Sequence, residues 1–167
     1  MKPLEGISVI DFTRVLAGPT CTRILAELGA SVIKIEPPSG DLARAGSPTV
    51  GGVAGYFLQL NGGKRNLCID LNWPEARKVV FDLCTNADVV VENFRPGTMT
   101  SFGLQYEAIS AANPKIVFVS MSGYGQHSPW SGRPAFATTV QAEAGATATV
   151  LAHYGENLHN PANDSSS

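Results

Sequence analysis

Several signals that assign a protein to a specialised class are missing from this sequence. Its 167 residues carry a net charge of only −2, so it lacks the basic excess with which proteins bind nucleic acid or anionic membranes. No apolar run is long enough to span a bilayer, and the first residues lack the charged and apolar segments of a signal peptide. We therefore expect a cytoplasmic protein that binds neither nucleic acid nor a membrane.

Metal-ligand and disulfide patterns are absent as well. The three cysteines, Cys21, Cys68 and Cys84, have no CxxC spacing and fall within apolar stretches, which predicts reduced, buried thiols. The histidines lack the spacing of zinc ligands. We expect no metal site.

The glycine-rich fingerprint of dinucleotide-binding proteins is incomplete. Residues 7–36 are typical of a strand, a loop, a helix and a second strand that ends in an acid, Glu36, where a ribose would bind. The loop holds a single glycine, Gly18, which is followed by Pro19, and there is no GxGxxG. An NAD-dependent dehydrogenase is therefore a disfavoured alternative.

What the sequence does contain is a regular alternation of strand and helix patterns. Apolar residues make up 44% and charged residues 16% of the chain, which indicates a folded domain. The expected strands are 7–11, 31–36, 66–70, 88–92 and 115–120, and the expected helices are 19–28, 56–60, 74–86, 106–112 and 135–151. This order predicts an α/β fold, a Rossmann-like three-layer lobe with a mostly parallel sheet over residues 1–151, followed by a polar tail at 152–167.

A polar loop follows the expected strand 88–92. Asn93, Phe94 and Arg95 stand directly after that strand, and a Pro-Gly pair closes the loop. Ligands of open α/β sheets bind beyond the carboxyl ends of the strands. An amide, a ring and a fixed cation at that position suit a phosphorylated, nucleotide-like ligand.

Five motifs in order resemble the N-terminal part of the family III CoA-transferases, which include formyl-CoA transferase, the carnitine CoA-transferases and the related α-methylacyl-CoA racemases. The motifs are VIDFTRVLAGP at 9–19, LGASVIKIEP at 28–37, NGGKR at 61–65, ENFRPG at 92–97 and SGYGQ at 122–126. Each motif alone is weak, and the resemblance rests on their order and spacing from about residue 4 onward.

The resemblance implies an enzyme that moves CoA from an acyl-CoA to a carboxylic acid. The family nucleophile is an aspartate placed after a helix of small residues, and it passes through an acyl anhydride and an aspartyl-CoA thioester. Asp164 is the matching position, with a solvated tail aspartate as the alternative reading. Gln126 matches a glutamine near the acyl end of the substrate. No tightly bound cofactor is implied, because CoA is the substrate.

The resemblance also implies which residues contact CoA. Val15, Leu16 and Ala17 match the loop after the first strand, and Leu71 and Asn72 match the residues after the third. Asn93 and Phe94 match the contacts after the fourth strand, next to Arg95. Lys64 and Arg65 would add positive charge nearby, or form an exposed basic turn.

Three positions depart from the family pattern. Pro37 stands where an arginine often meets the nucleotide, and Ser101 where a basic residue is common. Ala137 follows Phe136 where the racemases carry a His-Asp pair. Racemase activity is therefore not expected.

The match stops less than halfway along the family fold. Family members form interlocked homodimers, and the parts that complete the dimer and select the acyl groups lie beyond the last motif. We expect a fragment of a CoA-transferase, inactive alone, and the alternative is a non-catalytic CoA-binding or assembly fragment. The acyl donor and acceptor do not follow from these residues.

Overall fold

The computed structural model describes residues 2–154. The chain divides into two compact units, Met1–Met121 and Ser122–Ser167, called here the sheet unit and the second unit. The boundary expected at residue 151 falls inside the second unit.

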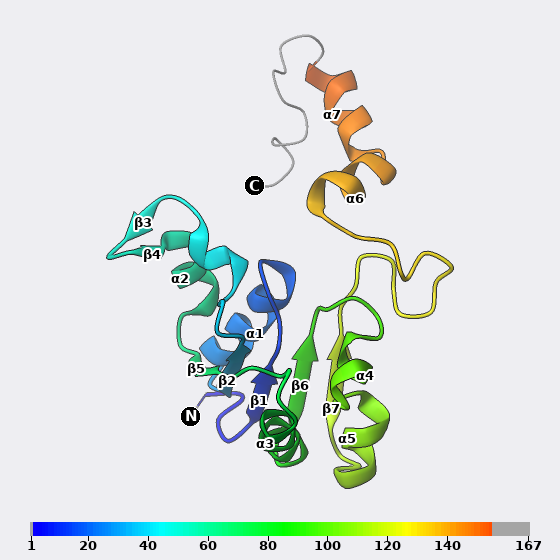
Figure 1. The fold of residues 1–167 in the computed structure, drawn as a ribbon. Coiled ribbons are helices and arrows are strands. Elements are labelled where there is room, and N and C mark those ends of the chain that lie inside the picture. Colours follow the sequence, from blue (N-terminus) through cyan, green and yellow to red (C-terminus); the bar gives the residue numbers. More distant parts are fainter. Residues whose placement is uncertain (1, 155–167) are drawn as a thin grey trace. The chain divides into compact units, whose positions relative to one another are not determined.

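Five parallel strands form the centre of the sheet unit (Figure 1). They are β1 (Ser8–Asp11), β2 (Ser31–Glu36), β5 (Arg65–Cys68), β6 (Val89–Glu92) and β7 (Val117–Ser120). Their order across the sheet is β5-β2-β1-β6-β7, and all four neighbouring pairs are parallel. The prediction of an α/β lobe with a parallel sheet is confirmed.

Helices cover both faces of this sheet. They are α1 (Ala17–Glu27), α3 (Pro74–Thr85), α4 (Thr98–Phe102) and α5 (Tyr106–Ala112). Leu25 and Ala26 of α1 pack against Val9, Val32 and Val91 on one face. The other three helices share the opposite face, because their apolar residues join the cluster that contains Ile10 and Val90.

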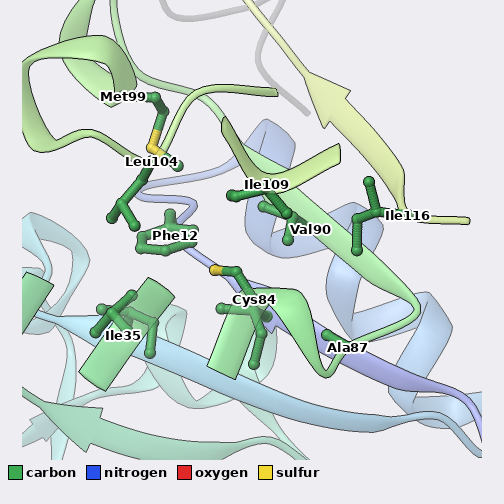
Figure 2. Close-up of a cluster of buried hydrophobic side chains, with 11 residues drawn as sticks. Phe12, Ile35, Cys84, Ala87, Val90, Met99, Leu104, Ile109 and Ile116 are labelled. Atoms are coloured by element: carbon green, nitrogen blue, oxygen red, sulfur yellow. The ribbon is translucent and has the colours of Figure 1, made fainter. Parts of the chain in front are cut away.

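That second cluster is the main core of the sheet unit, and its side chains converge between the helices and the strands (Figure 2). Val80 and Cys84 of α3, Met99 of α4 and Ile109 of α5 are all buried there. The alternation of strand residues between the two faces follows from the period of two in a pleated strand.

The helix boundaries follow local sequence signals. Pro19 occupies the first turn of α1 and Pro74 the first position of α3, where a missing N–H breaks no helical hydrogen bond. Gly29 follows α1 with a φ of 109°, the left-handed conformation that glycine adopts most easily.

Four short elements were not expected. The segment 37–50, predicted as loop, contains a turn of 3-10 helix, η1 (Leu42–Ala45), and the first strand of the antiparallel pair β3 (Thr49–Val50) and β4 (Val53–Ala54). The helix α2 (Gly55–Asn61) follows where a short helix was predicted. The fourth unexpected element is α4, which lies between two left-handed glycines, Gly97 and Gly103.

The second unit contains two short helices in its described part, α6 (Ala137–Glu143) and α7 (Ala146–Tyr154). The prediction of one helix over 135–151 is wrong, because Gly145 takes a φ of 75° and ends the first helical run. Neither helix contains a buried residue.

The cysteines differ in exposure. Cys84 is buried and Cys21 half-buried, but Cys68 is exposed on the edge strand β5, so the prediction of three buried thiols is wrong for Cys68. Among residues 2–154, no helix has the length and apolar character needed to cross a bilayer. No group of three or more His, Cys, Asp or Glu side chains in that range is arranged to hold a metal ion.

Candidate functional site

The strand order creates a crevice at one end of the sheet unit. The chain moves from β1 outward to β2 and β5, and then returns to place β6 on the other side of β1. In open α/β sheets the point at which the order reverses, beyond the carboxyl ends of the strands, is the usual ligand site. Here that point lies after Asp11 of β1 and Glu92 of β6.

A cleft of about 110 Å³ opens at this end of the strands. Its walls combine apolar and aromatic side chains with a few polar groups, as small-molecule sites do. The lining residues are Phe12, Arg14, Ile35, Pro37, Ile69, Asp70, Leu71, Asn72, Phe94 and Phe102.

Arg14 and Phe94 form the polar and aromatic parts of the cleft wall. The guanidinium carbon of Arg14 lies 5.0 Å from the centre of the Phe94 ring, which is within the range of a cation–π contact. Phe12 meets Phe94 edge to face, with 6.5 Å between ring centres. The Nε of Arg14 is buried and has no hydrogen-bond partner among the described residues. The cleft therefore offers a ring face next to a cation with unused donor capacity.

The side chain of Asn93 forms hydrogen bonds within the protein. Its Oδ1 accepts a hydrogen bond from the Arg14 N–H at 2.8 Å, and its Nδ2 donates to the Arg14 carbonyl at 2.9 Å. The amide thus pairs with both backbone groups of one residue and fixes the chain after β1 to the chain after β6. Asn93 does not line the cleft, whereas the neighbouring Phe94 does.

The loop after β1 is exposed and tightly held. Val15 and Leu16 are 41% and 48% exposed, and Ala17 is also exposed. The Val15 N–H donates to both carboxylate oxygens of Asp41, at 3.2 and 3.3 Å. Asp41 is itself paired with Lys34, with 3.1 Å between Nζ and Oδ2.

A second buried pair lies beneath the start of α1. Lys64 Nζ is 3.1 Å from Asp11 Oδ2, and the two side chains are 1% and 0% exposed. Burial lowers the pKa of Lys64, and the charge of Asp11 opposes that shift. The Pro19 carbonyl and the Asn61 Oδ1 accept further hydrogen bonds from the same ammonium. Lys64 is therefore neither an exposed basic turn residue nor a free cation for a ligand.

Glu36 is also occupied. Arg44 binds its two carboxylate oxygens at 2.7 and 2.8 Å, and Asn66 donates a further hydrogen bond. The Glu36 side chain is only 4% exposed. Because both carboxylate oxygens of Glu36 already accept hydrogen bonds, they are not free to bind a ribose. This disfavours the dehydrogenase alternative.

Glu92 ends β6 inside the protein. Burial raises the pKa of Glu92, and hydrogen bonds from Ser120 and from the Phe94 N–H at 2.7 Å oppose that rise. The Phe94 contact holds the turn that carries the ring into the cleft.

The site residues expected from the sequence divide into three groups. Leu71, Asn72 and Phe94 line the cleft. Asn93 and the 15–17 loop lie at the same end of the strands outside the lining, and Arg95 is exposed in the same turn as Phe94. Gln126 belongs to the second unit, where its Nε2 is buried and has no partner among the described residues. Asp164 lies outside the described residues.

Sequence reasoning missed several lining residues, above all Arg14 and Phe102. Arg14 follows the first strand by three positions, and its place just beyond the carboxyl end of a strand could have identified it as a candidate cleft residue. Phe102 was missed because it belongs to α4, which was not predicted. Pro37 does line the cleft, at the position where an arginine was noted to be absent.

Comparison with known proteins gives a consistent result. A model of the family described as "CoA-transferase family III" matches residues 4–163. The acetyl-CoA:oxalate CoA-transferase of Acetobacter aceti is 44% identical over 144 residues, which cover 86% of this chain and 37% of that protein. The succinyl-CoA:glutarate CoA-transferase of Homo sapiens is 42% identical over 147 residues, with coverages of 87% and 34%.

Solved structures show the same fold. Rv3272 from M. tuberculosis, in its orthorhombic form, matches with a TM-score of 0.82 at 41% identity, over 88% of this chain and 41% of that one. A CAIB/BAIF family protein from Brucella suis matches with a TM-score of 0.82 at 39% identity, over 86% and 39%. The chain thus spans between 34% and 41% of the length of these four proteins.

Proposed function

The chain belongs to the family III CoA-transferases, and from this membership we propose that it forms the CoA-binding part of an enzyme that transfers CoA from an acyl-CoA to a carboxylic acid. The observation that carries the proposal is the cleft at the reversal of strand order, where Arg14 and Phe94 stand side by side. A ring face suits the adenine of CoA, and a guanidinium suits its phosphates.

Within the chain, the residues have separate tasks. Leu71, Asn72 and Phe94 contact the nucleotide end of CoA, and Arg14 binds a phosphate. Val15, Leu16 and Ala17 lie along the CoA chain through their backbone, and Arg95 adds positive charge at the rim. Asn93 acts on CoA through the Arg14 backbone that it holds. Gln126 orients the acyl end.

The chemistry is assigned to Asp164 in a longer protein. Its carboxylate attacks the thioester carbonyl, giving a mixed anhydride and CoA thiolate. The thiolate then attacks the aspartyl carbonyl, which releases the first carboxylic acid and leaves an aspartyl-CoA thioester. The incoming carboxylate displaces the thiolate from that thioester, and the thiolate finally attacks the new acyl group, restoring Asp164.

An activity assay on a full-length protein that contains this chain tests the mechanism. Asp164→Ala is expected to abolish transfer while leaving CoA affinity nearly unchanged, because the carboxylate serves the acyl end only. Hydroxylamine trapping during turnover should modify Asp164, as read by mass spectrometry. Substantial transfer by Asp164→Ala would falsify the assignment.

Calorimetry with CoA tests the binding site on the 167-residue chain. Arg14→Gln should weaken binding by about tenfold, the typical loss when one charge-assisted hydrogen bond is removed. Arg23→Gln is the matched control, since Arg23 lies on α1 and pairs with Glu27. Equal affinities of the two variants would show that the cleft does not hold the CoA phosphates.

The chain alone is proposed to lack transferase activity. The chain spans only 37% of the length of its relative from Acetobacter aceti, and a small misplacement of a reacting group can cost about 100-fold in rate. Interlocked dimer formation and the choice of acyl groups are likewise proposed for the longer protein. Racemase chemistry is not proposed, because Phe136 and Ala137 have no side chain that can carry a proton.

A further inference from the structure

Val15 has a backbone conformation that its side chain disfavours. Its φ is 67°, and it is the one residue other than glycine with a positive φ in the part of the chain that the structure describes. A β-branched side chain in this left-handed region crowds its own backbone. Such a conformation persists only where surrounding contacts determine it.

Two side chains supply those contacts from opposite sides of β1. Asn93 pairs with both backbone groups of Arg14, the residue before Val15. Asp41 accepts the Val15 N–H with both of its carboxylate oxygens. The Asn93 contacts fix where the loop leaves β1, and the Asp41 contact fixes the direction of the Val15 N–H.

Asp41 is in turn held in place by a buried cation. Lys34 is 1% exposed and approaches Asp41 Oδ2 at 3.1 Å, while it also donates to the Thr13 carbonyl. Asp41 Oδ1 accepts the Ala43 N–H at 3.0 Å and so begins η1. Burial raises the pKa of Asp41, but the Ala43 N–H and the charge of Lys34 outweigh this and leave that pKa below its ordinary value. The carboxylate is thus charged, buried and unable to turn away.

We propose that Asp41, anchored by Lys34, is a positioning residue that holds Val15 in its left-handed conformation and so fixes the path of the exposed 15–17 loop at the end of the strands where the cleft opens. Its consequence for affinity rests on the proposed binding of CoA. The conformational part does not depend on CoA and can be read directly.

The first measurement is the backbone conformation of Val15 by NMR in the 167-residue chain. Lys34→Met/Asp41→Leu removes the acceptor without leaving an unpaired buried charge, a replacement that is often neutral for stability. We expect the HN–Hα coupling and the Cα and Cβ shifts of Val15 to leave the left-handed range, and its amide to exchange faster. Asp41→Asn keeps one acceptor oxygen and should change the coupling and chemical shifts of Val15 less, in the same direction. It replaces the double variant in this measurement if the double variant does not fold.

The second measurement is a rescue of CoA affinity by glycine. If only about one tenth of the molecules keep the competent loop, the apparent affinity falls about tenfold. Adding Val15→Gly makes the left-handed conformation easy to populate, so most of that loss should return. Asp82→Asn, a charge change on an exposed position of α3, is the matched control and should change neither readout.

The outcomes separate the two proposals. A left-handed Val15 in the Lys34→Met/Asp41→Leu chain overturns the positioning role. A changed Val15 without glycine rescue, in a chain whose parent binds CoA, overturns the link to binding. If the parent chain itself does not bind CoA, the proposed binding function fails for this chain, and the NMR result alone decides whether Asp41 sets the conformation of Val15.

Discussion

The sheet unit and the second unit are stabilised in different ways. The sheet unit buries a cluster of apolar side chains from β1, β2, β6 and three helices, and also buries the ion pairs Lys34–Asp41 and Lys64–Asp11. In the described part of the second unit, neither helix has a buried residue, and the Arg133–Glu143 pair is exposed. Helices gain most of their stability from packing, so the second unit is expected to open locally first.

The difference between the two units predicts where a substitution will lower the free energy of unfolding most. In the sheet unit, the Lys34–Asp41 and Lys64–Asp11 pairs are desolvated, so the loss of one partner leaves an uncompensated buried charge. In the second unit, the Arg133–Glu143 pair is exposed, so water can replace either partner when it is lost. The same kind of change should therefore have very different costs in the two units.

Asp11→Ala should have the largest effect on stability. Asp11 is fully buried and accepts hydrogen bonds from Lys64, Thr22 and Thr13. Its removal leaves the Lys64 ammonium without a counter-charge, which typically costs about 3–5 kcal/mol. Urea unfolding followed by circular dichroism measures this loss.

The Asp11→Leu/Lys64→Met double variant is the control for that prediction. It removes both charges and should recover most of the lost stability, because a well-packed apolar pair can replace a buried ion pair. If the double variant is as unstable as Asp11→Ala, the hydrogen bonds to the two threonines, rather than the charge, dominate.

A matched pair of apolar truncations compares the two units directly. Ile109→Ala opens the buried core next to α5 and should cost about 2–5 kcal/mol. Leu151→Ala on α7 removes a side chain that is 43% exposed, and should stay within about 0.5 kcal/mol. Urea unfolding, read by circular dichroism and by the fluorescence of Trp130 in a Trp73→Phe background, measures both. A large loss with Leu151→Ala would show that the second unit packs more tightly than its exposure indicates.

The fold was largely predictable from the sequence, because it depends on short-range patterns. The strands β1, β2 and β6 are apolar runs whose residues are mostly buried. Pro19, Gly29 and Pro74 mark helix boundaries through their own backbone preferences. The helix α4 was missed because five residues between two glycines carry too little periodicity. The 135–151 helix was wrong because Gly145 breaks an otherwise helical run.

The candidate site was only partly predictable. Residues directly after strands were identified, since parallel strands bring their carboxyl ends together. The roles of Lys34 and Asp41 were not, because one looks like a solvated strand residue and the other like a loop residue. Their pairing joins distant backbone positions through side chains, and no periodic pattern reports such a contact.

Cys84 tests how firmly the core of the sheet unit is closed. Burial raises the pKa of this thiol from 9.0 to about 12, so the unfolded chain releases the proton at lower pH than the folded chain. The contribution of the buried Cys84 thiol to the free energy of unfolding is fully present below pH 9. It is lost as the pH rises toward 12, by at most about 1.4 kcal/mol per pH unit. Urea unfolding at a series of pH values should show this decline, and Cys84→Ala should flatten it.

The exposed Cys68 provides the internal control for Cys84. Iodoacetamide at mildly alkaline pH should modify Cys68 in the native chain and Cys84 only after unfolding, because the thiolate is the reactive form. Peptide mass spectrometry distinguishes the two sites. Equal modification rates would mean that the core opens far more often than the packing in Figure 2 indicates.

The smallest expected effect on the stability of the sheet unit is that of Glu143→Gln in the second unit. Tyr124 donates a hydrogen bond to Glu143 Oε2 at 2.6 Å. That bond, with a smaller effect of burial and of the Glu143 charge, raises the pKa of Tyr124 above 10.0, while Arg133 opposes the rise. Removing the charge should lower the pKa of Tyr124 toward 10.0, as measured by NMR titration of its ring carbons. Tyr56 is the control, because burial is the main cause of its raised pKa.

An exposed ion pair contributes only about 0–1 kcal/mol, so the pKa of Tyr124 should move in the Glu143→Gln chain while the unfolding midpoint of the sheet unit stays the same. A drop in that midpoint comparable to that of Asp11→Ala would show that the two units do not differ as their burial implies.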